Sequence, residues 1–108
     1  MYNIIPDLRQ SATELIQYNV AGTCDAALVH STGQRLYFSL IGAALEPIEV
    51  KPLVDIVGQQ YPTLPPEKVQ TRAQRVALDL MRFSKLDERE RKTLADIALK
   101  AAAALESP

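Results

Sequence analysis

The stretch YPTLPP, residues 61–66, limits what this chain of 108 residues can fold into. Three of its six residues are proline, and proline can neither continue a helix nor donate a hydrogen bond to a central strand. Regular structure therefore ends before this stretch and begins again after it. The stretch is too short for a flexible linker, so we expect one domain over residues 1–108, with an N-terminal part (1–61) and a C-terminal part (66–108).

The C-terminal part has the clearest pattern in the chain. Its first apolar residues recur at steps of four, three, four and three, as on one face of a helix: Val69, Ala73, Val76, Leu80 and Phe83. Asp87 and Glu90 then form a capping box, which starts a second helix. The apolar face of that helix comprises Leu94, Ile97, Ala98, Ala101 and Leu105. The short break between the helices predicts an antiparallel helical hairpin.

The N-terminal part begins and ends with helical patterns. Pro6 and Asp7 suit the first turn of a helix. We expect this helix over about residues 6 to 20, with Gly22 as its stop. Pro52 opens another helix, which runs through LVDIVGQQY to the proline-rich stretch.

The segment between these helices, residues 24–45, fits two structures. Residues that favour strand flank the STGQ stretch, which has the character of a hairpin loop: Val29, Leu36, Tyr37, Phe38 and Ile41. Alternatively, Ser31 and Gln34 form a capping box, and the segment makes two helices. We favour the hairpin. The expected fold is then α+β and mostly helical, with an N-terminal helix, a β-hairpin and three further helices; the alternative is an all-α bundle.

Composition indicates a protein of the cytoplasm. The net charge is −1, with three basic against six acidic residues in 1–65 and nine against seven in 66–108. One cysteine, Cys24, excludes an internal disulfide. The N-terminus has no basic and apolar signal pattern. The longest apolar run, residues 36–45, is about half of a membrane span, so we expect no membrane association.

Catalytic patterns are missing from the sequence. Cys24 and His30 lie six residues apart, which brings them within hydrogen-bond reach neither in a strand nor in a helix. No spacing of cysteine, histidine and carboxylate residues matches a zinc site, and "HSTGQR" is not a phosphate-binding loop. We expect no enzyme, no metal and no cofactor.

The charged stretch "SKLDERERK" (residues 84–92) is typical of a solvated helix start. Asp87 precedes Arg91 by four residues, and Glu88 precedes Lys92 by four, the favourable order for ion pairs on a helix. A second hypothesis gives this region a binding role. Four basic residues would form a face that follows a phosphate backbone: Arg72, Arg75, Arg82 and Arg89. Acidic residues among them, and the lack of interleaved aromatic residues, argue against it.

Apolar residues that a small fold leaves uncovered indicate a binding surface. In the expected strand, Phe38 faces the helices, while Tyr37 and Ile41 point outward. A helix here would be apolar nearly all round and need burial on several sides. Both structures predict protein binding around Tyr37, Phe38 and Ile41. We therefore expect a non-catalytic adaptor, inhibitor or regulator that forms a homodimer; the alternative is a transcriptional regulator that binds nucleic acid.

Overall fold

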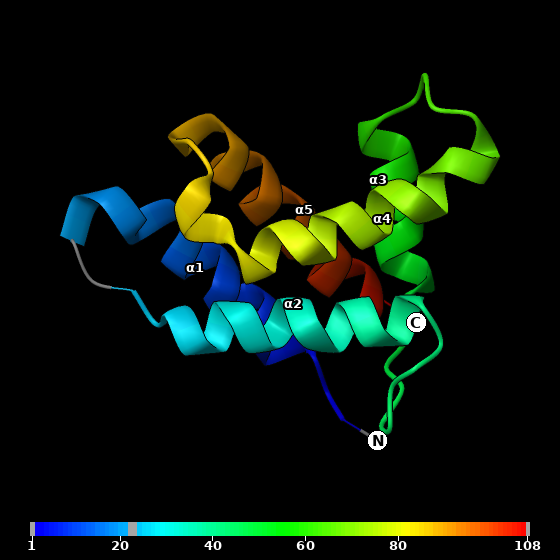
Figure 1. The fold of residues 1–108 in the computed structure, drawn as a ribbon, viewed down its shortest axis with the longest axis horizontal. Coiled ribbons are helices and arrows are strands. Elements are labelled where there is room, and N and C mark those ends of the chain that lie inside the picture. The colour runs from blue at the N-terminus through cyan, green and yellow to red at the C-terminus, as the bar shows by residue number, and fades with distance from the viewer. Residues whose placement is uncertain (1, 22–23, 108) are drawn as a thin grey trace.

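The computed structural model describes residues 2–21 and 24–107, which form five α-helices, one short 3-10 helix and no strand (Figure 1). The elements are α1 (Ile5–Ala21), α2 (Ala26–Leu40), α3 (Lys51–Gln60), α4 (Pro66–Met81), η1 (Phe83–Lys85) and α5 (Glu88–Glu106). The α+β prediction with its β-hairpin is therefore wrong, and the all-α alternative fits. Gly22, the expected stop of the first helix, lies outside the described residues.

Most of the segment that we expected to form the hairpin is one continuous helix, α2. Asp25 caps its start, since the side chain accepts a hydrogen bond from the Leu28 backbone N–H at 3.1 Å. The STGQ stretch is neither a turn nor a helix start but lies in the middle of α2. The buried residues of α2 share one helical face: Val29, Thr32, Gly33, Leu36 and Leu40. The sequence-based prediction assigned Thr32 and Gly33 to a turn, which divides this helical face in two. The strand propensity of the flanking residues then favoured a hairpin.

The helices form two layers that share one core (Figure 1). α2 and α4 pack together in the front layer of that view, α1 and α5 pack together behind them, and α1 also contacts α2. α3 stands at one end, where it contacts both α4 and α5. All five helices contribute buried residues to the core, so residues from 1–61 and from 66–108 are packed against one another throughout.

α4 and α5, which the sequence predicted as an antiparallel helical hairpin, are not each other's main packing partners. α4 packs chiefly on α2 and also on α3, whereas α5 packs chiefly on α1 and also on α3. η1 and Leu86 carry the chain from one layer to the other. Each of the two C-terminal helices thus has its main packing partner in the N-terminal part.

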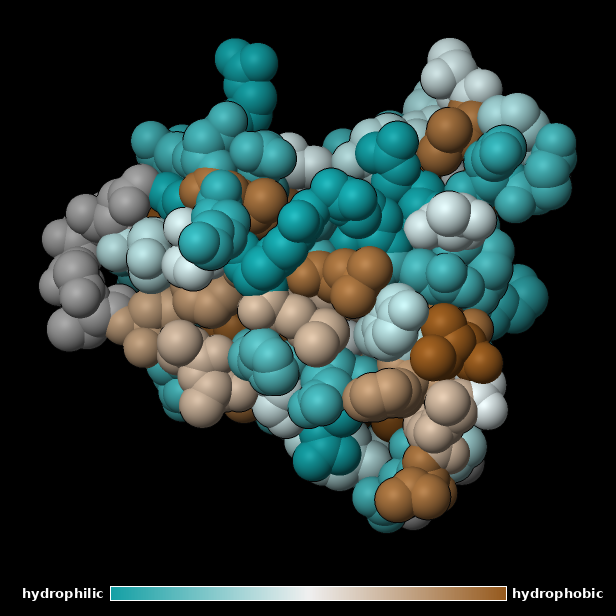
Figure 2. All heavy atoms as spheres, in the orientation of Figure 1, coloured by the Kyte–Doolittle hydropathy of each residue, from teal (hydrophilic) through white to brown (hydrophobic). Residues whose placement is uncertain are grey.

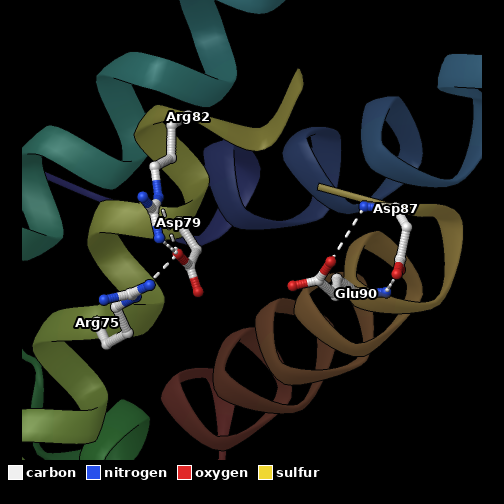
Figure 3. Close-up of polar contacts among 5 residues, drawn as sticks. All are labelled: Arg75, Asp79, Arg82, Asp87 and Glu90. Atoms are coloured by element: carbon white, nitrogen blue, oxygen red, sulfur yellow. Dashed lines mark hydrogen bonds and ion pairs between the residues drawn. The ribbon is translucent and has the colours of Figure 1, made fainter. Parts of the chain in front are cut away.

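The starts of α3, α4 and α5 follow the sequence closely. The capping box of α5 is present: the Glu90 N–H donates to the Asp87 carboxylate at 2.8 Å, and the Asp87 N–H donates to the Glu90 carboxylate at 3.2 Å (Figure 3). α3 and α4 each begin with proline in the first turn. These starts depend on residues within one turn of each other, so the sequence is sufficient to predict them.

Candidate protein-binding surface

Three apolar side chains at the C-terminal end of α2 and in the following loop are exposed. The exposed fraction is 39% for Phe38, 43% for Ile41 and 103% for Leu45. We call these three residues the apolar patch. Apolar surface covers this end of α2 and the loop, at the lower right of Figure 2. Exposed apolar surface of this kind, rimmed by polar residues, is typical of a binding site.

The way in which α2 ends places the patch. The Ala43 N–H donates to the Phe38 carbonyl at 2.8 Å, and Gly42 between them has φ of +74°. This left-handed conformation is favourable for glycine and closes many helices. The chain then folds back beside α2. Phe38, Ala44 and Leu45 consequently line the same hollow, of about 430 Å³, together with Arg35 and Glu46. We call it the loop hollow.

Tyr37 lies differently from its neighbour Phe38. It is half-buried against the core, and its ring meets the Phe38 ring edge-on at a centroid distance of 6.0 Å. Tyr37 lines a second, open hollow of about 830 Å³ that runs along α4 and includes Leu64 and Leu78. We call it the α4 hollow. Tyr37 and Phe38 thus lie between two adjacent hollows.

The helical structure corrects the predicted directions of these side chains. A strand would have turned Phe38 inward and Tyr37 outward, whereas in α2 Phe38 is the more exposed of the two. Ile41 is exposed, as the strand also predicted. Leu45 was not among the predicted binding residues. Its signal was a large apolar residue at the end of the ambiguous segment, directly before Glu46 and Pro47.

The four arginines of the proposed basic face differ in their surroundings: Arg72 and Arg75 lie on α4, Arg82 directly follows it, and Arg89 lies on α5. Arg75 and Arg82 both donate to the Asp79 carboxylate, at 3.2 and 3.0 Å (Figure 3). The Arg72 guanidinium lies over the Tyr61 ring, 4.6 Å from its centre. Arg72 and Arg89 line a narrower cleft of about 210 Å³ between α4 and α5. Two of the four arginines thus share one carboxylate, which offsets one of their two positive charges.

Arg91 is buried, although the sequence placed it on the solvated or basic surface. Only 4% of the residue is exposed. Its guanidinium donates to the Leu86 carbonyl and lies 4.9 Å from the centre of the Tyr18 ring. The Tyr18 ring in turn meets Phe83 edge-on at 5.4 Å. Arg91 therefore joins the start of α5 to the end of α1 and does not form the expected ion pair with Asp87.

Two other expected ion pairs on α5 are present. Lys92 and Glu88 are 3.3 Å apart, and Lys100 and Asp96 are 2.9 Å apart. Both pairs are well exposed, so each stabilises the helix by only a few tenths of a kcal/mol. These charges are therefore explained by the helix itself.

Cys24 and His30 lie in different surroundings. Burial raises the pKa of the Cys24 thiol, and the nearby Glu14 carboxylate raises it further. The thiol is thus held in its less nucleophilic, protonated form. His30 is exposed on α2. Within residues 2–21 and 24–107, no group of three His, Cys, Asp or Glu side chains is arranged to hold a metal ion.

Arg35 of the loop hollow is held in place by the N-terminus. Its guanidinium lies 3.9 Å from the centre of the Tyr2 ring. The Tyr2 hydroxyl donates to the Asp7 carboxylate, and this hydrogen bond raises the pKa of Tyr2. These contacts attach the N-terminal residues to the side of α2.

The fold belongs to the all-α class, with five α-helices within residues 2–21 and 24–107. Comparison with protein families, with curated proteins and with solved structures found no match to this chain. None of the helices in the described part of the chain is long and apolar enough to span a membrane. The function therefore has to be argued from the surface itself.

Proposed function

We propose that this chain is a non-catalytic, cytoplasmic protein-binding protein, an adaptor, inhibitor or regulator that self-associates through its apolar patch. The observation that carries the proposal is Leu45, which is fully exposed beside the half-exposed Phe38 and Ile41. Single exposed leucines are common on protein surfaces. Here, however, Leu45 and Phe38 line one hollow, and Ile41 is exposed three residues after Phe38; such a group is typical of a surface that a partner covers.

The energetics of the patch favour a partner of apolar character. Burying a leucine, isoleucine or phenylalanine side chain contributes about 1.5–3 kcal/mol. Such residues dominate affinity when they lie at the centre of an interface, and the polar residues around them exclude water. Arg35 and Glu46 lie at the edge of the loop hollow and supply that polar rim.

Retention of proteins from the native lysate tests this function. The tagged protein and its Ile41→Asp variant are incubated with lysate that has or has not been treated with nuclease, and the retained proteins are compared. We expect at least one protein that withstands nuclease and moderate salt, and that the variant loses. Leu99→Asp is the matched control, because Leu99 is similarly exposed at 39% on α5. Equal retention by wild type and Ile41→Asp would refute binding by the patch.

The alternative function, nucleic-acid binding, uses Arg72, Arg75, Arg82 and Arg89. Three basic side chains along the α4 hollow support it, namely Lys68, Arg72 and Arg75. Binding through phosphates would fall steeply between about 50 and 200 mM salt, whereas apolar contact would not. Recovery that disappears with nuclease in the same experiment would favour this alternative.

A further inference from the structure

The apolar patch and the α4 hollow together form a surface that is complementary to itself. We propose that two copies of the chain form a two-fold symmetric dimer in which the loop carrying Leu45 and Glu46 docks into the α4 hollow of the other copy, and the reverse. This inference rests on the proposed function and names its partner, a second copy of this chain. The two contacts are equivalent by symmetry.

Shape is the first argument. Leu45 projects from the loop with no cover from its own chain, so it is available for insertion into a partner. The α4 hollow is open and about 830 Å³ in volume, with Leu64, Leu78 and Tyr37 among its lining residues. Leu78 is itself 37% exposed. An apolar projection and an open hollow that offers apolar contacts at Tyr37, Leu64 and Leu78 among polar residues are thus present in one molecule.

Position is the second argument, because a two-fold contact needs both surfaces on one face. Gln70 of α4 donates to the Leu40 carbonyl at 3.1 Å, which fixes α4 beside the end of α2 from which the loop departs. Tyr37 lines the α4 hollow, and the adjacent Phe38 lines the loop hollow. Figure 2 shows apolar areas on one face, one at the middle of α4 and others near this loop, with polar surface between them. A two-fold axis between the loop and the α4 hollow would bring each of them against the other surface of the second copy.

Charge is the third argument. The loop between α2 and α3, residues 41–50, carries two glutamates, Glu46 and Glu49, and no basic residue. The α4 hollow has three basic side chains against two acidic ones. Of the acidic pair, Asp79 is already engaged by Arg75 and by Arg82. An acidic loop therefore meets a hollow with surplus positive charge, which favours this pairing over loop against loop.

The first test is the effect of Leu45→Asp on the dimer, followed by sedimentation velocity over a range of protein concentrations. Leu45 touches nothing that the fold needs, so circular dichroism should stay unchanged. We expect the wild type to dimerise and Leu45→Asp to weaken the dimer about 100-fold or more, since two symmetry-related leucines lose their burial. Leu99→Asp, on α5 and outside both hollows, should dimerise as the wild type does.

The second test is a charge exchange between the two surfaces. Glu46→Lys and Lys68→Glu each place like charges opposite one another at both contacts, and each alone should weaken the dimer about tenfold. An equimolar mixture of the two variants restores opposite charges at both contacts. We therefore expect the mixture to form heterodimers with affinity close to that of the wild type. Glutamate at position 68 is also compatible with the first turn of α4.

Other outcomes overturn the inference in distinguishable ways. A wild type that stays monomeric at every concentration would refute the dimer, while retention of another protein in the lysate test would still support binding by the patch. A dimer that Leu45→Asp leaves intact would use another surface, and the patch would have no part in self-association. A dimer lost in Leu45→Asp but not restored in the charge mixture would show that the loop docks elsewhere than on α4.

Discussion

Gly33 of α2 lies directly against the backbone of Ala77 in α4. A Cβ atom at Gly33 would come within 2.6 Å of the Ala77 carbonyl oxygen and within 2.8 Å of the Leu80 Cβ atom. Neither neighbour is the end of a flexible side chain. The missing side chain therefore sets the spacing between α2 and α4, and with it the position of the apolar patch beside the α4 hollow.

Gly33→Ala should destabilise the protein, although alanine is the better helix former by about 1 kcal/mol. The added methyl group forces α2 and α4 apart, and overpacking of this kind costs about 1–3 kcal/mol net. We expect a lower midpoint of urea unfolding, and a Tm lower by at least about 4 °C.

Gly58→Ala is the matched control, because Gly58 also lies inside a helix. A Cβ atom there would meet the Val69 Cγ1 atom at 3.6 Å, an ordinary contact. This variant should be as stable as the wild type or more stable by up to about 1 kcal/mol. Equal stability gains in the two variants would show that α2 and α4 are not in close contact at Gly33.

A buried pair of hydroxyl groups joins α1 to α2. The Ser11 hydroxyl donates to the Thr32 hydroxyl at 3.1 Å, and the Thr32 hydroxyl donates to the Leu28 carbonyl at 2.9 Å. Thr32→Val leaves the Ser11 hydroxyl buried without this partner, which should cost about 1–3 kcal/mol. Ser11→Ala should cost less, because Thr32 keeps its bond to Leu28.

The double variant separates this effect from a general loss of packing. Adding Ser11→Ala to Thr32→Val removes the stranded hydroxyl, so the double variant should be no less stable than Thr32→Val alone. Urea unfolding of the four proteins measures the coupling. Strictly additive losses would contradict a direct hydrogen bond between the two side chains.

Two neighbouring arginines of the charged stretch should respond very differently to truncation. Arg91→Ala removes the donor to Leu86 and the stacking on Tyr18, and should cost about 2–3 kcal/mol of unfolding free energy. Arg89→Ala changes an exposed side chain and should stay within about 0.5 kcal/mol of the wild type. Thermal unfolding of the two variants checks this, and equal losses would be inconsistent with the burial of Arg91.

Glu14 should make stability depend on pH. Its carboxylate accepts hydrogen bonds from the Asp25 backbone N–H at 2.9 Å and from Gln10 at 2.8 Å. These bonds lower the pKa of Glu14, the bond to Asp25 most of all. The resulting stabilisation is fully present above the pKa of glutamate in the unfolded chain, about 4, and is lost as the pH falls through the lower folded pKa.

Comparison with Glu14→Gln isolates this contribution. The stability difference between wild type and variant, from urea unfolding at several pH values, should be constant near neutral pH. It should shrink as the pH drops below about 4. A difference that stays unchanged in acid would mean that the Glu14 carboxylate is not specifically bonded in the folded state.

The local features of this protein follow directly from its sequence. The proline-rich stretch at 61–66 separates α3 from α4, and Asp87 with Glu90 starts α5, as the patterns predicted. The apolar seam from Val69 to Phe83 is buried or partly buried in the structure. Each of these features depends on residues within a turn or two of one another, so propensity, capping and periodicity are sufficient to find them.

Other features depend on contacts between residues that are far apart in the sequence, and these became visible in the folded structure. Thr32 and Gly33 have the character of turn residues in the sequence but lie within α2. There Thr32 contacts Ser11, 21 positions away, and Gly33 contacts Ala77, 44 positions away. Likewise α4 packs chiefly on α2, and α5 packs chiefly on α1. Burial of Arg91 and exposure of Leu45 follow from that same packing. A short window of sequence does not contain the distant helices that pack on these residues, and this packing determines the fold.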